Sequence, residues 1–329
     1  MKRKYAVLLS GVAVLALATG ILMGKAIFST KENIRTEATA ASAKQESEKE
    51  KQDAESQQNT ENQQDTEEQQ NAENQRNTEN RRNMLLIYDI EDGYMQVPYL
   101  NNVPNHIYDW NNLHEKNGFK YYIDGEGTVS RIGIDVSYFQ NNIDWAKVKN
   151  AGVDFVMLRM GFRGYSEEGK LVADEKFHQY IKEAQDAGLD TGVYFFSQAV
   201  NEDEAREEAE FVYQECKDYE LTCPVAFDTE KIKGDTARTD NLKPEELTDI
   251  TIAFCEKIKE YGYEPMIYAN AKWLTTKLQL ERLTDYPVWY ADYQENPLYP
   301  YSFEMWQYTE SGQVDGIEGN VDVNIWFSN

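Results

Sequence analysis

The sequence contains few of the residues that commonly bind metals or cross-link a chain. Its 329 residues include three cysteines and three histidines. Cys216, Cys223 and Cys255 are too few and too widely spaced for a disulfide framework or a zinc site. The spacing leaves a Cys216–Cys223 bridge open, but buried free thiols are the state that we expect. Two histidines precede residue 131 and the third falls in a predicted helix, so no predicted strand end carries a histidine as a metal ligand or base.

Basic residues are scarce as well. The formal net charge is −25 at pH 7, and no basic stripe is present that could meet nucleic-acid phosphates. We therefore expect no nucleic acid partner, although much of the negative charge lies in one low-complexity segment. The sequence also lacks a Gly-x-Ser-x-Gly motif, which argues against a serine hydrolase.

One long stretch without charge runs from Tyr5 to Gly24, directly after three basic residues. About 20 apolar residues span a bilayer as a helix, and a basic flank favours the cytoplasmic side. We therefore predict that residues 1–30 form a cytoplasmic tip and a transmembrane signal anchor, which places the C-terminal domain outside the cell. The alternative is a cleaved signal peptide and a secreted protein. The anchor is favoured because Lys25 interrupts the apolar run before any small-residue cleavage site.

Residues 31–83 have almost no apolar side chains and contain a six-residue repeat that begins with QQNTEN at Gln57. Without a hydrophobic stripe, this repeat builds neither a coiled coil nor a packed solenoid. We predict a disordered spacer, because the segment buries too little apolar surface to offset its ordering entropy; a fluctuating, partly helical stalk is the alternative. Residues 84–130 form a tyrosine-rich lead-in, which we expect to pack on the following domain rather than to be a small interaction module.

From residue 131 to residue 329, short apolar segments alternate with charged segments of helical period, which indicates β/α units around parallel strands. Eight candidate strands cover residues 131–137, 155–162, 191–197, 223–230, 264–270, 286–293, 304–309 and 320–327. Five candidate helices cover residues 144–150, 174–187, 202–219, 244–261 and 272–283. The last strands are joined without a clear helical pattern, so we predict an irregular, TIM-like (β/α) barrel with a helix-poor second half.

Two carboxyl groups, Asp228 and Glu230, follow the apolar run from Val225 to Phe227. Residues two apart in a strand point to the same side, about 6.6 Å apart. Like charges at close range raise one pKa, so one carboxyl stays protonated while the other is ionised. Glycoside hydrolysis uses such a pair. An isolated Asp-x-Glu is more often a solvated strand end, so the neighbouring strands decide between the two interpretations.

Barrel enzymes carry their chemistry at the carboxyl ends of the strands, and these ends are rich in acids and aromatic residues here. The residues that we select from them are Asp135, Tyr194, Phe196, Tyr268, Trp289, Gln307, Asp322 and Asn324. Aromatic faces beside hydrogen-bonding groups suit sugar rings, which present CH groups on their faces and hydroxyls on their edges. Because neighbouring residues point to opposite faces, we expect about half of the strand-end aromatics to be core residues instead.

These motifs, in this order, resemble glycoside hydrolase family 25, the Chalaropsis-type lysozymes, from about Ile132 to Phe327. The matching parts are GIDVS with Gln140 and Ile143-Asp144-Trp145, Tyr194-Phe195-Phe196, Asp228-Thr229-Glu230, Met305-Trp306-Gln307-Tyr308, Val314-Asp315-Gly316-Ile317 and Val321-Asp322-Val323-Asn324. The resemblance implies an irregular barrel, no metal and no cofactor. It also implies hydrolysis of the β-1,4 bond between N-acetylmuramic acid and N-acetylglucosamine in peptidoglycan. The lead-in before Arg131 is a weaker match and is similar to the segment that precedes this domain in some membrane-anchored members from Gram-positive bacteria.

By the same resemblance, the acidic set of the active site is Asp135, Asp228, Glu230 and Asp322. We expect Glu230 to be the general acid and Asp228 to stay ionised, either as a nucleophile or to orient the substrate's own acetamido group. The expected substrate contacts are Tyr194, Phe196, Tyr268, Trp289, Gln307 and Asn324, and the expected state is a monomer. The alternative is a catalytically silent, membrane-tethered protein that binds peptidoglycan or acts as a scaffold; the intact acidic set favours the enzyme.

Overall fold

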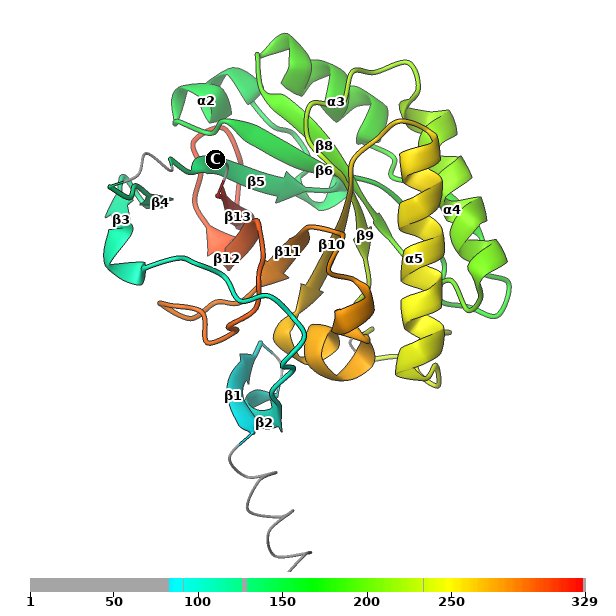
Figure 1. Cartoon of the computed structure of the whole chain (residues 1–329). Helices are drawn as coiled ribbons and strands as arrows, with labels where there is room; N and C mark the ends of the chain where they lie inside the picture. Colours follow the sequence, from blue (N-terminus) through cyan, green and yellow to red (C-terminus); the bar gives the residue numbers. More distant parts are fainter. Residues whose placement is uncertain (1–82, 91, 126–128, 233, 328–329) are drawn as a thin grey trace, which may run out of the picture. The chain divides into compact units, whose positions relative to one another are not determined.

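The computed structural model describes residues 83–90, 92–125, 129–232 and 234–327 (Figure 1). The predicted anchor, residues 1–30, and all but the last residue of the predicted spacer, residues 31–83, lie outside these ranges. Within them, no helix is both long enough and apolar enough to cross a bilayer. The three cysteines are buried and unpaired, as expected.

Eight strands close into a barrel-like sheet in the spatial order β5, β13, β12, β11, β10, β9, β8 and β6, with β6 paired back to β5. Their bounds are β5 Arg131–Val136, β6 Phe155–Arg163, β8 Asp190–Phe196, β9 Val225–Asp228, β10 Pro265–Asn270, β11 Val288–Ala291, β12 Met305–Gly312 and β13 Val321–Trp326. All eight predicted strands are present, which confirms a mixed α/β barrel. One further strand, β7 (Leu171–Ala173), was not predicted and pairs antiparallel with the end of β6.

The last strand departs from the predicted parallel arrangement. β13 runs antiparallel to both of its neighbours, β12 and β5, whereas the other neighbouring barrel strands are parallel. The physical reason is the short connection, residues 313–320, between β12 and β13. A parallel partner needs a crossover of a dozen or more residues, whereas an antiparallel partner needs only a tight turn.

Four α-helices cover one side of the barrel: α2 Trp145–Asn150, α3 Phe177–Asp186, α4 Glu202–Cys216 and α5 Pro244–Glu260 (Figure 1). Residues at the amino-terminal ends of the two longest helices, α4 and α5, explain where these helices begin. The Asn201 side chain accepts a hydrogen bond from the Glu204 backbone at 2.9 Å and caps α4. Pro244 occupies the first turn of α5, where its missing N–H costs nothing.

The fifth predicted helix, residues 272–283, is wrong as a regular helix. The structure instead has a π-helical turn, η3 (Trp273–Lys277), and a 3₁₀ turn, η4 (Leu280–Arg282). Two threonine hydroxyls in this segment, those of Thr275 and Thr276, donate to carbonyl oxygens four residues earlier, both at 2.7 Å. Such side-chain bonds compete with a regular helix.

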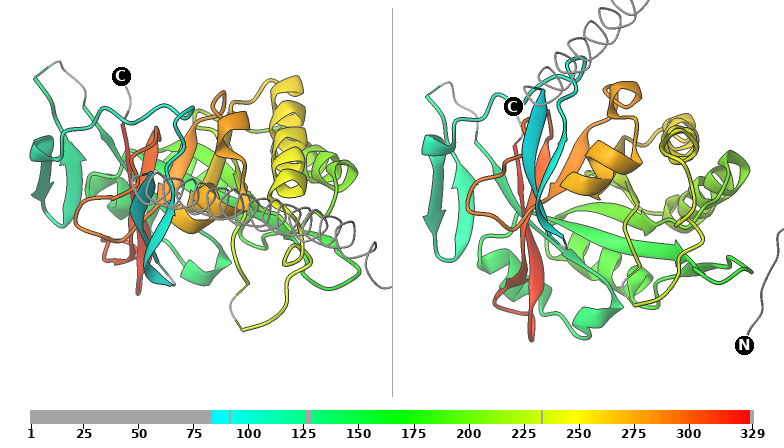
Figure 2. Two further views of the ribbon diagram at one scale, coloured as in Figure 1. Left: turned by 60° about the horizontal axis from the view of Figure 1, so that its bottom comes forward. Right: turned by 90° about the horizontal axis from the view of Figure 1, so that it is seen from below.

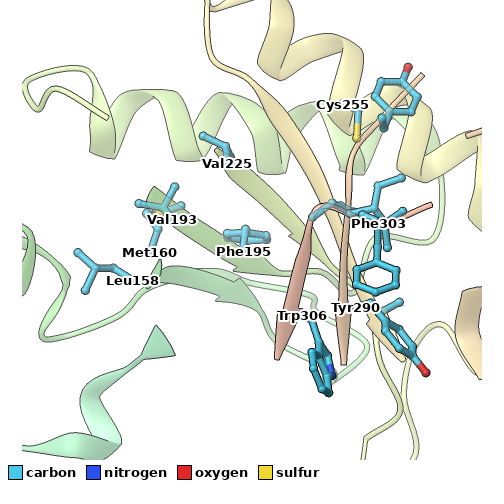
Figure 3. Close-up of a cluster of buried hydrophobic side chains, with 14 of the residues drawn as sticks. Leu158, Met160, Val193, Phe195, Val225, Cys255, Tyr290, Phe303 and Trp306 are labelled. Atoms are coloured by element: carbon cyan, nitrogen blue, oxygen red, sulfur yellow. The ribbon is translucent and has the colours of Figure 1, made fainter. Parts of the chain in front are cut away.

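Strand residues alternate between two buried clusters. The smaller cluster fills the barrel and contains Phe155, Met157, Cys223, Ala226, Met266, Trp289 and Met305. The larger one lies outside the sheet and includes Val193, Phe195 and Val225 from adjacent strands (Figure 3). The interior is tight, since a β-carbon at Gly192 would lie 2.6 Å from Met157 Sδ and 2.7 Å from the Pro224 carbonyl oxygen.

The outer face of the last strands is aromatic, and the lead-in packs on it. The Tyr108 ring stacks on the Phe327 ring at 4.0 Å, and its hydroxyl donates to the Phe303 carbonyl oxygen at 2.7 Å. Trp110 lies 5.8 Å from Trp306, measured between ring centroids. The lead-in contains two hairpins, β1 (Met84–Asp89) with β2 (Gly93–Pro98) and β3 (Leu113–Lys116) with β4 (Phe119–Tyr122). Lead-in side chains therefore cover sheet that no helix covers in the described part of the chain.

This packing predicts the effect of truncating Phe303, which is 2 % exposed and contacts the rings of Tyr108 and Trp110. We expect Phe303→Ala to lower the free energy of unfolding by about 3–5 kcal/mol, because it leaves a cavity between lead-in and barrel. Ile107→Ala is the control, because Ile107 lies next to Tyr108 in the lead-in but is 90 % exposed, and its truncation should change the free energy of unfolding by about 0.5 kcal/mol or less. Urea unfolding of the full chain measures both. Equal unfolding midpoints would contradict the packing.

Candidate active site

A cleft of about 590 Å³ opens at the carboxyl ends of the parallel strands. Every barrel strand except β6 contributes a side chain to it. These strand residues are Asp135, Tyr194, Phe196, Asp228, Tyr268, Trp289, Gln307, Glu310 and Asp322. Residues from the connecting segments complete the wall and are Ile90, Phe139, Glu230, Lys231, Ile232 and Tyr293. The four predicted acids therefore lie in one cleft.

Asp228 and Glu230 both line this cleft, but from different kinds of structure. Asp228 is the last residue of β9 and is 3 % exposed. Glu230 lies two residues past the strand and is half-buried. β9 is thus shorter than the predicted strand, which included both acids. Asp228 Oδ1 is buried and makes no hydrogen bond within the described residues. A buried carboxylate oxygen without a partner is costly, and such groups are typical of functional sites.

The environment of Asp228 favours its protonated form. Burial raises the pKa of Asp228 well above its ordinary range, and the negative charges of Glu230 and Asp135 raise it further, while Arg159 opposes the rise. Two carboxyls that repel each other in this way titrate together, and the pair retains one proton over a wide pH range. The expectation that Asp228 stays ionised in the free protein therefore differs from the state that its burial favours.

A chain of hydrogen bonds ends at Asp135 and fixes its role as an acceptor. Trp289 Nε1 donates to Asn324 Oδ1 at 2.8 Å, and Asn324 Nδ2 donates to Asp135 Oδ2 at 2.8 Å. An indole N–H can only donate, so it fixes the orientation of the Asn324 amide. The Asn324 side chain is fully buried and holds Trp289 and Asp135 in place. It does not line the cleft, so the structure separates it from the other predicted substrate contacts.

Gln307, like Asn324, donates a side-chain amide hydrogen bond to Asp135. Its Nε2 donates to Asp135 Oδ2 at 2.9 Å, while its Oε1 accepts from the hydroxyls of Tyr268 and Tyr293, each at 3.0 Å. The two hydroxyl donors orient the Gln307 amide, so a second N–H points at the same carboxylate oxygen. Together with the bonds of Asn324, this network joins five strands (β5, β10, β11, β12 and β13) and the segment after β11 at the base of the cleft.

Asp322 lies opposite Asp135 in the register of β13 and β5 and forms a side-chain hydrogen bond with it. Burial raises the pKa of Asp322 to about 9, and the charge of Asp135 adds to the rise. Burial also raises the pKa of Asp135, but the hydrogen bonds from Asn324, Gln307 and Asp322 oppose that rise. The arrangement therefore places the proton on Asp322, and the protonated Asp322 carboxyl donates a hydrogen bond to Asp135.

Three of the predicted aromatic contacts form a continuous wall. The Trp289 ring packs edge-on against Tyr268 at 4.6 Å and against Tyr194 at 6.0 Å. Phe196 lies beside Asp228 in the register of β8 and β9. By contrast, Trp306 and Tyr308 belong to the buried cluster outside the barrel, and the Trp306 indole donates to the Asp292 carbonyl oxygen at 2.7 Å. Alternation along the strands thus divides the aromatics between the cleft and the outer core, as expected.

Several residues that line the cleft were not predicted from the sequence. Tyr293 carries a signal that could have found it, because it lies four residues after Trp289 and so continues the inward-facing side of that strand. Phe139 and Lys231 lie in segments without a strand-end motif, and Glu310 lies one residue beyond the predicted end of its strand. Ile90 comes from the lead-in, and no local pattern connects it to the site. In the described ranges, no group of three or more histidine, cysteine or acidic side chains has the geometry of a metal site.

The sequence model of "Glycosyl hydrolases family 25" matches residues 134–317, which is more than half of the chain. The chain therefore belongs to glycosyl hydrolases family 25, a family of glycosidases.

Individual relatives agree with this class. The autolytic lysozyme of Clostridium acetobutylicum is 25 % identical over 193 residues, which are 58 % of this chain and 54 % of that protein. Lysozyme M1 of Streptomyces globisporus is 27 % identical over 202 residues, 58 % of this chain and 66 % of the relative. The chain thus spans little more than half the length of the first of these lysozymes.

A solved structure is similar over a larger part of the chain. It is the modular autolysin LytC of Streptococcus pneumoniae in complex with a synthetic peptidoglycan ligand. The alignment has a TM-score of 0.54 and 26 % identity, and it covers 74 % of this chain and 57 % of LytC.

The protonated state of Asp322 predicts how stability depends on pH. A carboxyl whose pKa is raised from 3.8 to about 9 stabilises the fold at low pH, and this contribution is lost as the pH rises through that window. The Asp322→Asn variant keeps an N–H donor toward Asp135 but cannot ionise. We expect the variant to gain stability relative to the wild type between pH 5 and pH 8.5, by roughly 1–3 kcal/mol.

Urea unfolding at the two pH values measures this change. The control is Asp315→Asn, because Asp315 is exposed in the loop after β12, and its difference from the wild type should not change with pH. A constant difference for Asp322→Asn, or one that shrinks as the pH rises, would contradict the assignment of the proton.

Proposed function

We propose that the chain is a peptidoglycan hydrolase that cleaves the β-1,4 bond between N-acetylmuramic acid and N-acetylglucosamine. The observation that carries this proposal is the pair Asp228 and Glu230 in a cleft whose wall is aromatic and whose base is an ordered polar network. The family of the chain, the lysozymes among its relatives and the peptidoglycan ligand bound by LytC support it.

In the proposed reaction, Glu230 is the general acid and protonates the glycosidic oxygen of the departing sugar. Asp228 is its partner. In the reacting complex the shared proton lies on Glu230, because the positive charge that develops at the anomeric carbon favours an ionised Asp228. The Asp228 carboxylate then either bonds to that carbon or holds the substrate's acetamido group for attack, and water completes hydrolysis.

The remaining predicted residues position these groups and the sugar. Asp135 and Asp322 share one proton between them and set the charge next to Asp228. Tyr194, Tyr268 and Trp289 offer ring faces and edges to the CH surfaces of sugar rings. In the free protein Gln307 already has its amide oriented by two tyrosine hydroxyls, so binding does not have to order it.

The competing function is a cleft that binds peptidoglycan without turnover. It is less well supported, because a pure binding site has no use for a buried carboxyl whose pKa is raised by a neighbouring acid.

The decisive variant is Glu230→Gln. We expect it to reduce the release of reducing ends from purified bacterial walls by about 10²–10⁴-fold, because it removes the acid but not the shape of the cleft. Glu310→Gln is the matched control, since Glu310 lines the same cleft from β12 and is exposed; it should lose far less. Equal hydrolysis by wild type and Glu230→Gln would end the catalytic assignment. No hydrolysis by the wild type would favour the binding protein.

We also propose that residues 1–30 anchor the protein in the cell membrane, with residues 31–83 as a spacer and the catalytic domain outside the cell as a monomer. The support is the uncharged run from Tyr5 to Gly24 behind a basic flank. Amino-terminal sequencing of the membrane fraction tests the anchor. An intact amino terminus in that fraction is expected, whereas a new terminus beyond Lys25 and a soluble product would show a cleaved signal peptide.

A further inference from the structure

Phe139 is an exposed aromatic residue in the wall of the cleft. It lies in η2 (Tyr138–Gln140), a 3₁₀ turn that follows the carboxyl end of β5. The exposed fraction of Phe139 is 64 %, whereas that of Trp289 in the aromatic wall is 1 %, although both residues line the same cleft. A single exposed apolar side chain is ordinary on a protein surface. The role of Phe139 therefore depends on how its ring is held and where it lies.

Two neighbouring side chains hold the Phe139 ring in place. The centroid of the Tyr138 ring lies 4.1 Å from that of Phe139, and the Arg159 guanidinium carbon lies 5.3 Å from the Phe139 centroid. Arg159 is itself fixed, because its Nε donates to Asp174 Oδ2 at 2.9 Å and the Asp174 carboxyl is buried. The same Oδ2 accepts a hydrogen bond from the Tyr138 backbone at 3.1 Å. The turn and the cation that packs on its rings therefore share one buried anchor, while most of the Phe139 side chain stays open to solvent.

The backbone of the turn is fixed as well. The Ser137 N–H donates to Gln140 Oε1 at 2.9 Å. Asn141, which ends the turn, has a φ of 55°, a value that few residues other than glycine adopt, and its carbonyl oxygen accepts a hydrogen bond from the Tyr180 hydroxyl. Strained backbone persists where the surroundings hold it, and such positions gather at functional sites. The Phe139 ring is thus presented in one orientation before a ligand binds, which lowers the entropic cost of a contact with it.

The place of Phe139 at the mouth of the barrel suits a polymer. Three strands separate β5 from β10 in either direction around the closed sheet, which can be followed in Figures 1 and 2. The turn that carries Phe139 therefore follows the strand opposite the one that carries Tyr268. Because Tyr268 belongs to the aromatic wall, this wall and the Phe139 ring come from opposite sides of the mouth. A chain of sugars that spans the mouth contacts both.

The chemistry of an open phenyl face selects the ligand. A phenyl ring forms no conventional hydrogen bond and carries no charge, so it matches the CH groups on the face of a pyranose ring and not the hydroxyls on its edge. We propose that Phe139 forms a subsite at the edge of the cleft on which an N-acetylhexosamine ring stacks, apart from the sugar that reacts. This inference rests on the proposed muramidase function and adds to it a contact that tightens the binding of glycan strands. Glu230 and Asp228 remain the reacting groups.

The test measures hydrolysis of soluble glycan strands from which an amidase has removed the peptides. We expect Phe139→Ala to raise KM by about 5–20-fold and to change kcat by less than about twofold, because the lost contact holds the strand and not the reacting bond. Phe139→Trp keeps a flat ring, so its KM should stay within about twofold of the wild type. Phe139→Leu keeps apolar volume without a flat face and should raise KM nearly as much as Phe139→Ala.

The matched control is Tyr165→Ala. Tyr165 is 48 % exposed in the connection between β6 and β7 and is not among the residues that line the cleft. Its truncation should leave KM and kcat unchanged. The midpoint of urea unfolding should be the same in the Phe139 variants as in the wild type, because the ring is exposed. A rise in KM that appears only together with a lower midpoint would assign Phe139 a structural role and overturn the subsite.

A binding measurement separates the subsite from the proposed function. Calorimetry on the Glu230→Gln variant with a peptide-free glycan hexasaccharide should show an affinity that falls about 5–20-fold when Phe139→Ala is added. An unchanged KM and an unchanged affinity in Phe139→Ala would overturn the subsite while hydrolysis persists, and so would a KM that Phe139→Leu preserves as well as Phe139→Trp does. A wild type that binds the hexasaccharide through Phe139 but hydrolyses no glycan would instead overturn the muramidase function and leave the subsite in place.

Discussion

The closing strand β13 is the element on which the site depends most. Its antiparallel pairing with β5 sets Asp322 opposite Asp135 and brings Asn324 within hydrogen-bonding distance of the same carboxylate. A shift of one residue in this register would turn both side chains to the other face of the sheet. The register therefore determines the charge at the base of the cleft. Closure of the barrel and the assembly of the acidic site are one structural event.

The outer face of the second half of the barrel is covered in a different way from that of the first half. Helices α3, α4 and α5 cover the outer faces of the early strands. On that face the later part of the barrel carries bulky aromatics such as Trp306 in β12 and Phe327 directly after β13. The lead-in supplies Tyr108 and Trp110 as their partners. An aromatic layer thus replaces helices, and it explains why a segment outside the family range is built into the same core.

Much of this architecture could be predicted, because short apolar runs with regular spacing identify strands whatever their neighbours are. The direction of β13 could not, since a hydrophobic pattern reads the same both ways and only the length of the connection decides. The prediction of a regular helix at residues 272–283 was wrong. The apolar spacing there is that of a helix, but the threonine hydroxyls bond to backbone carbonyl oxygens, and the segment forms a π-helical turn and a 3₁₀ turn instead.

Within the site, the pair Asp228 and Glu230 could be predicted because it follows a buried apolar run and the other predicted strand ends carry further acids and aromatic residues. Only the folded sheet shows that Trp289 lies in the cleft and Trp306 in the outer core. Alternation predicts that neighbouring strand residues point to opposite faces, but it does not predict which face is inside the barrel. Ile90 could not be found from sequence, because its approach to the cleft depends on how a distant hairpin packs.

The filled interior of the barrel has a consequence for how a polymer is handled. Met266 and Met305 occupy the space beneath Trp289, and Gly192 leaves no spare room beside Met157. No passage leads through the barrel along this line of packed side chains. A long glycan chain must therefore lie across the mouth rather than thread through it, so both halves of a cut strand depart from the same side. Under the proposed function, this geometry allows cuts at interior bonds, because neither end of the glycan strand has to enter the barrel.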